Sequence, residues 1–179
     1  MVTDLVQIGR LTASHAAENL AFQRQLEAHH YPAEPFQVLC EQIEEQIDCK
    51  SCANCCRQTR VGVSPGEIAR IADYLGITPD DVVRQYTAVD PDNHSARLLA
   101  HTKTGCVFLD GNLCIVYEAR PLACREFPHL DTGHRSLGSR LPSVFKRASF
   151  CPIVFNVLER YKKLTGFRYD SLRCSGNTA

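Results

Sequence analysis

Four cysteines within eight residues are the feature of this sequence that most directly specifies a chemistry. The run is Cys49-x2-Cys52-x2-Cys55-Cys56, and further cysteines follow at Cys106, Cys114, Cys124 and Cys151. A Cys-x2-Cys turn presents two thiolates to one metal because the backbone folds back within a single turn, and this spacing is common in zinc and iron–sulfur sites. Where thiols are kept reduced, such a cluster indicates metal binding rather than disulfides. The sequence therefore predicts that these eight cysteines are metal ligands.

The pattern leaves open how the eight thiols are shared. Adjacent Cys55 and Cys56 normally point in different directions, so one of them closes the first site while the other serves a second metal or packs. Eight thiolates match two four-thiolate sites, or one such site with additional thiols around it. Cys151 precedes a proline at an expected helix start, where the amide dipoles favour a thiolate. Cys40, on an apolar helix face, and Cys174, in a polar tail, are excluded as ligands.

A site of four thiolates carries net negative charge, which nearby cations must compensate. Five arginines lie close to the cysteines in the sequence: Arg57, Arg60, Arg120, Arg125 and Arg147. Arg120 and Arg125 bracket Cys124 and are favoured as donors to sulfur. The histidines show no comparable spacing, so we do not expect them to be ligands.

Composition restricts the partners. The 179 residues carry 20 Lys+Arg and 20 Asp+Glu, so no strong overall field attracts nucleic acid. No apolar stretch approaches the roughly 20 residues that span a bilayer, so no membrane partner is expected. The first residues lack the apolar core of a secretory signal, which favours the cytoplasm. The expected partner is a metal ion or cluster, with another protein as a further candidate.

Apolar spacing predicts helices on both sides of the cysteine run. The stripe formed by Phe36, Leu39, Cys40, Ile43 and Ile47 indicates one helix, and a less sharply patterned helix is expected over about 13–30. After the run, a short strand over 61–63 precedes two capped helices. Ser64, Pro65 and Glu67 form a capping box at the first, and Gly76 ends it. Thr78 and Pro79 begin the second.

The second group of cysteines follows a strand-like segment over 97–103. Residues 105–109 and 113–116 are predicted to form a tight hairpin around Asp110-Gly111-Asn112, which would place Cys106 and Cys114 within a rung or two of each other. Residues 131–143, rich in Gly, Ser and Arg, are expected to be a loop. Pro152 opens a last helix whose apolar face runs from Ile153 to Leu164.

These elements predict an α+β fold, namely a small, mainly helical domain with a short β-hairpin organised around the cysteine-ligated metal. Residues 1–47 are expected to be a helical segment packing on the core. Residues 48–152 form the cysteine-cluster domain, and 153–179 a C-terminal helix and loose tail.

The ordered motifs resemble a known family. They are the run over 49–56, Gly105-Cys-Val-Phe-Leu109, Cys114-Ile-Val-Tyr117, Arg120-Pro-Leu-Ala-Cys-Arg125-x-Phe127-Pro128 and Cys151-Pro152. Together, over roughly residues 48–152, they resemble the CxxCxxCC cysteine-cluster proteins, the zinc- or iron-chelating domain family also called YkgJ-like proteins. The resemblance implies a metal-chelating domain. One departure is Ala53, where the family often has Gly.

The resemblance and the residues leave two functional classes. The first is a metal-binding protein whose iron–sulfur cluster, [4Fe–4S] by preference, or zinc is structural or redox-active. The second is a metal-dependent protein-modifying enzyme or its accessory subunit, because a related cysteine cluster occurs in flagellin lysine methylase. The sequence offers no dinucleotide or phosphate loop and no catalytic motif of a metalloprotease or serine hydrolase, so no catalytic residue is assigned. The compact cysteine run and distant Cys-Pro pair favour iron–sulfur narrowly over zinc.

Overall fold

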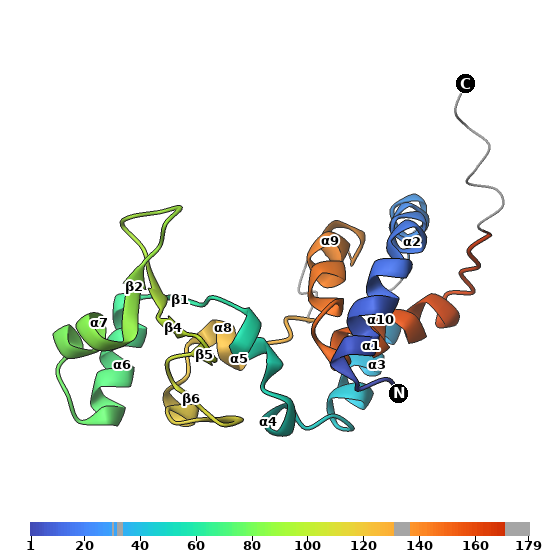
Figure 1. Cartoon of the computed structure of the whole chain (residues 1–179). Helices are drawn as coiled ribbons and strands as arrows, with labels where there is room; N and C mark the ends of the chain where they lie inside the picture. Colours follow the sequence, from blue (N-terminus) through green and yellow to red (C-terminus); the bar gives the residue numbers. More distant parts are fainter. Residues whose placement is uncertain (30, 32–33, 131–136, 171–179) are drawn as a thin grey trace. The chain divides into compact units, whose positions relative to one another are not determined.

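The computed structural model describes residues 1–29, 31, 34–130 and 137–170 (Figure 1). The chain divides into two compact units: unit 1, Met1–Ile47 with Pro128–Ala179, and unit 2, Asp48–Phe127. Helices predominate over three small antiparallel sheets, which confirms the predicted α+β class. Organisation of the fold by a metal, and packing of residues 1–47 on the cysteine domain, stay predictions.

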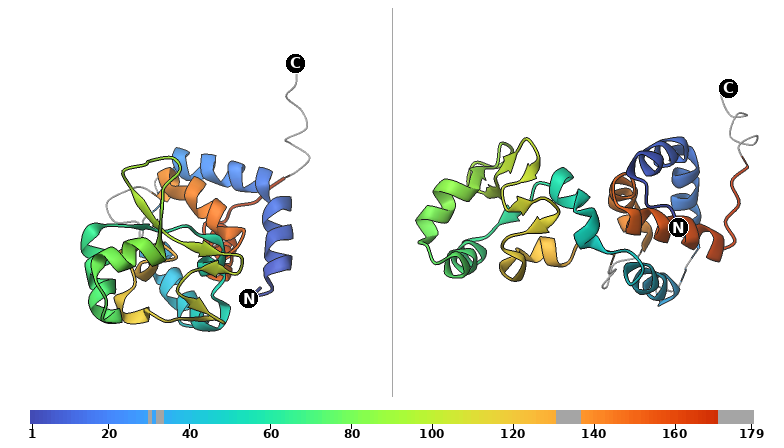
Figure 2. Two further views of the ribbon diagram at one scale, coloured as in Figure 1. Left: turned by 60° about the vertical axis from the view of Figure 1, so that its left-hand side comes forward. Right: turned by 60° about the horizontal axis from the view of Figure 1, so that its bottom comes forward.

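The regular secondary structure of unit 1, within its described residues, is entirely helical. Its helices are α1 (Leu5–Ser14), α2 (Ala16–Ala28), α3 (Glu34–Glu44), α9 (Leu137–Ala148) and α10 (Pro152–Leu164). Helix α10 packs against α3, α9 and α1, and α2 packs against α9 (Figure 2). The helix expected over about 13–30 is α2, and α1, which precedes it and ends at His15, was not predicted.

The core of unit 1 is built on one aromatic residue of α10. The Tyr161 ring lies 6.1 Å from that of Phe22 and 5.0 Å from that of Phe36, both edge-on. Helix α3 buries Phe36, Cys40 and Ile43, so the predicted apolar stripe is confirmed there. Leu164, predicted on the buried face of the last helix, is 60% exposed because α10 ends at this residue.

A buried lysine links two helices of unit 1. Lys162 is 3% exposed, and its Nζ donates to Glu18 Oε1 at 2.9 Å and to Glu159 Oε1 at 2.7 Å. His15 Nδ1 lies 3.3 Å from the same Glu159 oxygen. One ligand atom each from His15, Glu18 and Glu159 lies within 4.8 Å of the others, which is a metal-like spacing. The Lys162 ammonium already supplies the cation there, so the group is a structural ion-pair network.

The predicted loop over 131–143 is wrong from Leu137 onward, where α9 begins; residues 131–136 lie outside the described residues. Leu141, Val144 and Ala148 are buried at helical spacing. Tertiary packing of this face outweighs the low helix propensities of the Gly, Ser and Pro in the same stretch.

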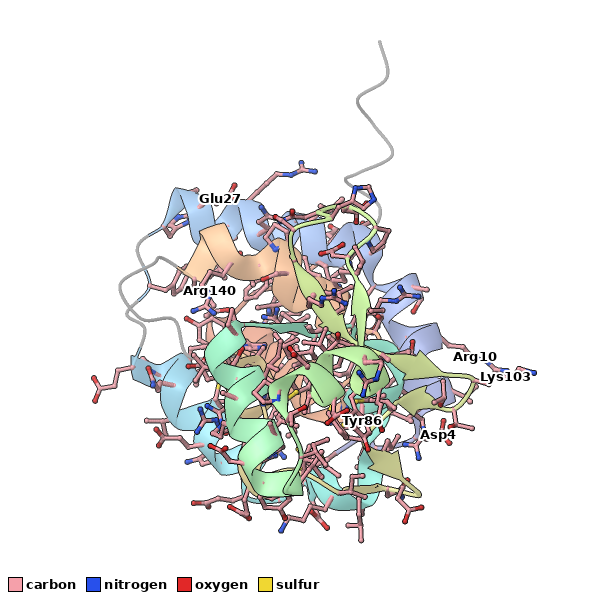
Figure 3. All side chains as sticks on the ribbon, turned by 90° about the vertical axis from the view of Figure 1, so that its left-hand side faces the viewer. Asp4, Arg10, Glu27, Tyr86, Lys103 and Arg140 are labelled. Atoms are coloured by element: carbon pink, nitrogen blue, oxygen red, sulfur yellow. The ribbon has the colours of Figure 1, made fainter. Side chains whose placement is uncertain are left out.

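Unit 2 rests on two capped helices, α6 (Pro65–Leu75) and α7 (Pro79–Tyr86). The capping box of Ser64 and Glu67 is present, and Gly76 ends α6 at a φ of 68°. Thr78 caps α7 by accepting the N–H of Asp81. These helix boundaries confirm the prediction. Their apolar faces share one core with Phe108 and Val116, and Tyr86, labelled in Figure 3, stacks on Phe108 at 4.9 Å.

The strands in the described part of unit 2 are short and belong to three sheets. One sheet has the order β1 (Gly62–Val63), β3 (Arg97–Leu99), β2 (Thr87–Val89). The other two are the pairs β4 (His101–Thr102) with β5 (Gly105–Cys106), and β6 (Leu109–Asp110) with β7 (Leu113–Cys114). Lys103 projects from the β4–β5 turn (Figure 3).

The predicted hairpin over 105–116 is therefore correct only for its inner part, the turn between β6 and β7. Gly105 and Cys106 pair back with Thr102 and His101 instead of forward with β7. The Val107 N–H donates to the Ala100 carbonyl, which extends this earlier pairing. Cys106 and Cys114 consequently sit on different ladders.

Four short helical segments complete unit 2: α4 (Cys49–Cys52), α5 (Asn54–Gln58), the 3₁₀ helix η1 (Tyr117–Ala119) and α8 (Leu122–Arg125). Three of the four carry or adjoin cysteines. Across the described residues, every helix is too short or too polar to cross a membrane.

Candidate metal centre

The cysteine run forms two short helices joined by one left-handed residue. Ala53 adopts φ 46° and ψ 17° between α4 and α5, and is only 4% exposed. Asp48 caps α4, with its Oδ1 accepting the Lys50 N–H at 2.9 Å. The left-handed step at Ala53 turns the chain between Cys52 and Cys55, at the position where glycine was expected from the family pattern.

A hydrogen-bonded clamp fixes this run to the turn between β6 and β7. Arg57 donates from Nη2 to Gly111 O at 2.8 Å and to Asn112 Oδ1 at 2.6 Å, and from Nη1 to Cys52 O at 3.1 Å. Asn112 Nδ2 donates to Ser51 O at 2.7 Å. The sequence indicated Asn112 only as a turn residue; nothing in its spacing pointed to the second contact.

Cys55 and Cys56 lie side by side in α5, with their sulfur atoms 3.9 Å apart. The hydrogen bond from Cys55, followed by the positive charges of Arg57 and Arg120, lowers the pKa of Cys56 to about 7. At neutral pH this sulfur is therefore ionised in a large fraction of molecules. The thiolate is the form of cysteine that binds a metal cation.

The charge of Cys56 affects the pKa values of three further cysteines in unit 2. Burial, with added repulsion from neighbouring thiolates, raises the pKa of Cys106 to about 11 and that of Cys124 to about 12, and it also raises the pKa of Cys114. The negative charge of Cys56 raises the pKa of all three. That of Cys114 raises the pKa values of Cys106 and Cys124, and that of Cys106 raises the pKa of Cys124. Every pair among these four thiols thus interacts.

Two of these thiols have backbone N–H groups of the same kind nearby. The N–H of Phe108 lowers the pKa of Cys106 and the N–H of Val116 lowers that of Cys114, each from two residues further along the chain and against the larger effect of burial. Both donors follow the end of a short strand, and both side chains are 1% exposed in the core. Backbone N–H groups aimed at sulfur stabilise thiolates and tune metal–thiolate centres.

The segment that carries Cys124 is held by α6 and by an arginine. The Glu67 carboxylate of the capping box also accepts the Leu122 N–H at 2.8 Å, which fixes the start of α8. Arg120 packs its guanidinium 3.4 Å from the centre of the Tyr117 ring and donates from Nε to Tyr117 O at 2.7 Å. Its positive charge acts to lower the pKa values of Cys56, Cys114 and Cys124, in opposition to burial at all three.

The five arginines predicted to compensate the thiolate charge have different surroundings in the structure. Arg57 and Arg120 act on thiols of unit 2, whereas Arg147 interacts with Cys151 in unit 1. Arg60 and Arg125 are exposed. The contributions of Tyr117, Glu67 and Asn112 were not predicted, because each acts through a partner distant in the sequence.

The predicted ligands lie in different elements and in both units of the structure. Cys56, Cys106, Cys114 and Cys124 come from α5, β5, β7 and α8 and interact with one another. Cys49 and Cys52 lie in α4. Cys151 is buried in unit 1 as the N-cap of α10, and its role as a ligand stays a prediction. Cys40 is buried in the core of unit 1, and Cys174 lies outside the described residues.

Comparison with known protein families agrees with the cysteine pattern. A family model described as "CxxCxxCC: Putative zinc- or iron-chelating domain" matches residues 48–152. The chain belongs to this family. The matched range contains all eight predicted ligands of this CxxCxxCC protein and excludes Cys40 and Cys174.

One curated relative is "Uncharacterized protein MJ0661" of Methanocaldococcus jannaschii, which is 34% identical over 83 residues. The match covers 45% of this chain and 43% of that protein, so the chain corresponds to less than half of the relative. No solved structure matches the chain significantly. The family therefore supports metal chelation and leaves the metal open.

Proposed function

We propose that this CxxCxxCC protein holds an iron–sulfur cluster through thiolates of unit 2, in a structural or redox role. The observation that carries the proposal is that seven of the eight predicted ligands, all except Cys151, lie in unit 2 and within the residues that the family model matches. Soft thiolates select zinc or iron–sulfur among the metals available to proteins. The family description is consistent with both.

The cysteine spacing supports the iron–sulfur group. The Cys49-x2-Cys52-x2-Cys55 run resembles the first part of the cysteine run that ligates clusters in bacterial ferredoxins. Cys151 precedes Pro152, as the last cysteine of such a run precedes a proline.

The electrostatic surroundings also suit a negatively charged cluster. Arg57 and Arg120 supply positive charge beside Cys56, and the backbone N–H groups of Phe108 and Val116 favour the thiolate forms of Cys106 and Cys114. Such hydrogen bonds and charges set the stability and potential of iron–sulfur clusters. When bound, the cluster would provide a one-electron redox group or a structural cross-link. The residues of the chain would hold it and exclude water from it.

Anaerobic purification with an absorption spectrum and elemental analysis tests this function. We expect brown protein with iron and acid-labile sulfide, broad absorption near about 400 nm, and bleaching in air. Colourless protein with stoichiometric zinc would overturn the iron–sulfur assignment and preserve thiolate chelation. Protein that binds neither metal after anaerobic reconstitution would overturn both.

A further inference from the structure

One aromatic ring in unit 2 receives two cations from segments that are far apart in the sequence. The Lys50 ammonium lies 4.7 Å from the centre of the Tyr117 ring, and the central guanidinium carbon of Arg120 lies 3.4 Å from it. We propose that Tyr117 is a positioning residue of the metal centre, whose ring holds the helix that begins at Cys49 to the segment that leads to Cys124. This inference rests on the proposed metal-binding function and adds to it how the cysteine run and the later cysteines are held together.

Helix α6 fixes the chain that follows Tyr117. Arg70 donates from Nη2 to Arg120 O at 2.8 Å, and Glu67 Oε1 accepts the Leu122 N–H at 2.8 Å. The other oxygen of the same carboxylate closes the capping box at the start of α6. Two side chains of one helix thus hold neighbouring peptide groups, and the segment between η1 and α8 is anchored to α6.

The Arg120 side chain folds back from this anchored segment onto Tyr117. Its Nε donates to Tyr117 O at 2.7 Å while its guanidinium lies over the ring. A distance of 3.4 Å between the guanidinium carbon and the ring centre is van der Waals contact, so the guanidinium occupies the ring face on which it lies. Arg120 therefore fixes both the backbone and the ring of Tyr117, and the ring is held in place for a second cation.

The second cation comes from the cysteine run. Lys50 directly follows Cys49 in α4, and its backbone N–H donates to Asp48 Oδ1 at 2.9 Å. The next peptide group is also held, because Asn112 Nδ2 donates to Ser51 O at 2.7 Å. Helix α4 thus has one contact to the β6–β7 turn and a second, through Lys50, to the ring in η1. Both contacts join the cysteine run to segments that follow much later in the sequence.

The two cations at the ring have no carboxylate partner. Among the residues that the structure describes, neither Lys50 nor Arg120 forms a salt bridge with Asp or Glu. Two positive charges at one ring repel each other, and the negative ring face offsets only part of this repulsion. A metal–thiolate centre carries the negative charge that would offset the rest. Metal binding and the closed arrangement of Lys50, Tyr117 and Arg120 should therefore stabilise each other.

Two substitutions at Tyr117 in the full-length protein test this role, with Zn²⁺ and Co²⁺ as probes. Tyr117→Phe keeps the ring faces that make both contacts, whereas Tyr117→Leu keeps only apolar bulk, and neither changes the net charge. We expect Tyr117→Phe to bind Zn²⁺ like the unaltered protein. Tyr117→Leu should bind it about tenfold more weakly, which is the order of magnitude of two lost cation–π contacts. Its Co²⁺ complex should also show weaker thiolate absorption, a change that a loss of stability alone would not produce.

Lys50→Met separates an effect through the ring from an effect of charge, and Lys50 is exposed, so the fold should tolerate it. This substitution should weaken Zn²⁺ binding about threefold in the unaltered background and have no further effect in Tyr117→Leu, where the ring contact is already lost.

Equal Zn²⁺ affinities of Tyr117→Leu and Tyr117→Phe would overturn the positioning role and leave thiolate chelation in place. So would undiminished binding by Lys50→Met, or the same weakening by Lys50→Met in both backgrounds. Unaltered protein that binds neither Zn²⁺ nor Co²⁺ would overturn the proposed chelation, and the role of Tyr117 with it.

Discussion

Gly105 passes so close to Cys56 that a side chain at this position has no room. A Cβ there would lie 2.9 Å from the Cys56 carbonyl oxygen and 3.0 Å from Arg57 Cα, both backbone atoms, and Gly105 has a φ of +131°. The glycine thus serves two needs at once: close approach of two backbones and a conformation that L-residues avoid. It brings the strand of Cys106 against the helix of Cys56.

Gly105→Ala should therefore destabilise unit 2 and weaken metal loading together. Backbone strain alone should cost about 1 to 3 kcal/mol, and the clash adds to it. Urea unfolding and bound metal per chain measure the two effects. Gly66→Ala is the matched control, because Gly66 lies in α6 with open space around it. That variant should be neutral or more stable by up to about 1 kcal/mol. Equal effects of the two substitutions would contradict the argument.

The Arg57–Asn112 clamp should be cooperative. Arg57→Lys removes the planar fork that reaches Gly111 O and Asn112 Oδ1, and Asn112→Ala removes the acceptor and the donor to Ser51 O. Each substitution should cost about 0.5 to 1.5 kcal/mol of unfolding free energy. The double variant should cost less than the sum, since both break the same contact. Strict additivity in urea titrations would show that the two side chains act independently.

Metal binding should release protons. At pH 8 Cys56, with a pKa of about 7, is mostly ionised, whereas Cys106 and Cys124, with pKa values of about 11 and 12, are protonated. The pKa of Cys114 is also raised, so three ligands must lose a proton to bind. Near pH 8, binding of Zn²⁺ to this set should displace about three protons, and its apparent affinity should fall steeply as the pH is lowered.

Calorimetric titration with Zn²⁺ in buffers of different ionisation enthalpy measures the number of protons released. The matched control is Cys40→Ala, because Cys40 is buried in unit 1, is excluded as a ligand and has a pKa raised by burial to about 12. That variant should release the same number of protons as the unaltered protein. Release of one proton or fewer by the unaltered protein would contradict a centre made of these thiols.

Ala53 should tolerate glycine and reject a branched residue. Its left-handed conformation costs an alanine about 1 kcal/mol, and its buried methyl group recovers roughly as much. Ala53→Gly should thus change stability by less than about 1 kcal/mol and leave metal loading unaltered. Ala53→Val should cost about 2 kcal/mol or more, because β-branched residues are disfavoured at positive φ. Thermal unfolding with metal analysis distinguishes these outcomes.

Lys162 should be a stability determinant of unit 1. Lys162→Met leaves the carboxylates of Glu18 and Glu159 close together without their shared cation, which should cost about 2 to 3 kcal/mol. Lys163→Met, at an exposed neighbouring position of α10, should change stability by less than about 0.5 kcal/mol. Adding Glu18→Gln and Glu159→Gln to Lys162→Met should recover part of the loss. Denaturant unfolding of the four proteins checks this order.

The sequence by itself determined the local structure and the kind of chemistry. The capping box of Ser64 and Glu67, the left-handed Gly76 and the Asp110–Asn112 turn are specified by residues within a few positions of one another, so each was predicted correctly. The apolar stripe of α3 and the start of α10 at Pro152 follow from the same local rules. The cysteine spacing determined the family, because that pattern is a property of the linear chain.

Only the tertiary structure decided which segments meet. Cys106 pairs on the ladder of His101 instead of opposite Cys114, because strand pairing depends on a backbone that returns from outside the predicted hairpin. Helix α9 forms where propensity predicted a loop, because its buried face has a partner in α10. The fit of Gly105 against Cys56, and the hydrogen bonds of Arg57 to Gly111 and Asn112, arise from contacts between residues about 50 positions apart. Such contacts are selected by packing and backbone hydrogen bonding, whose energies depend on three-dimensional proximity and leave no local pattern in the sequence.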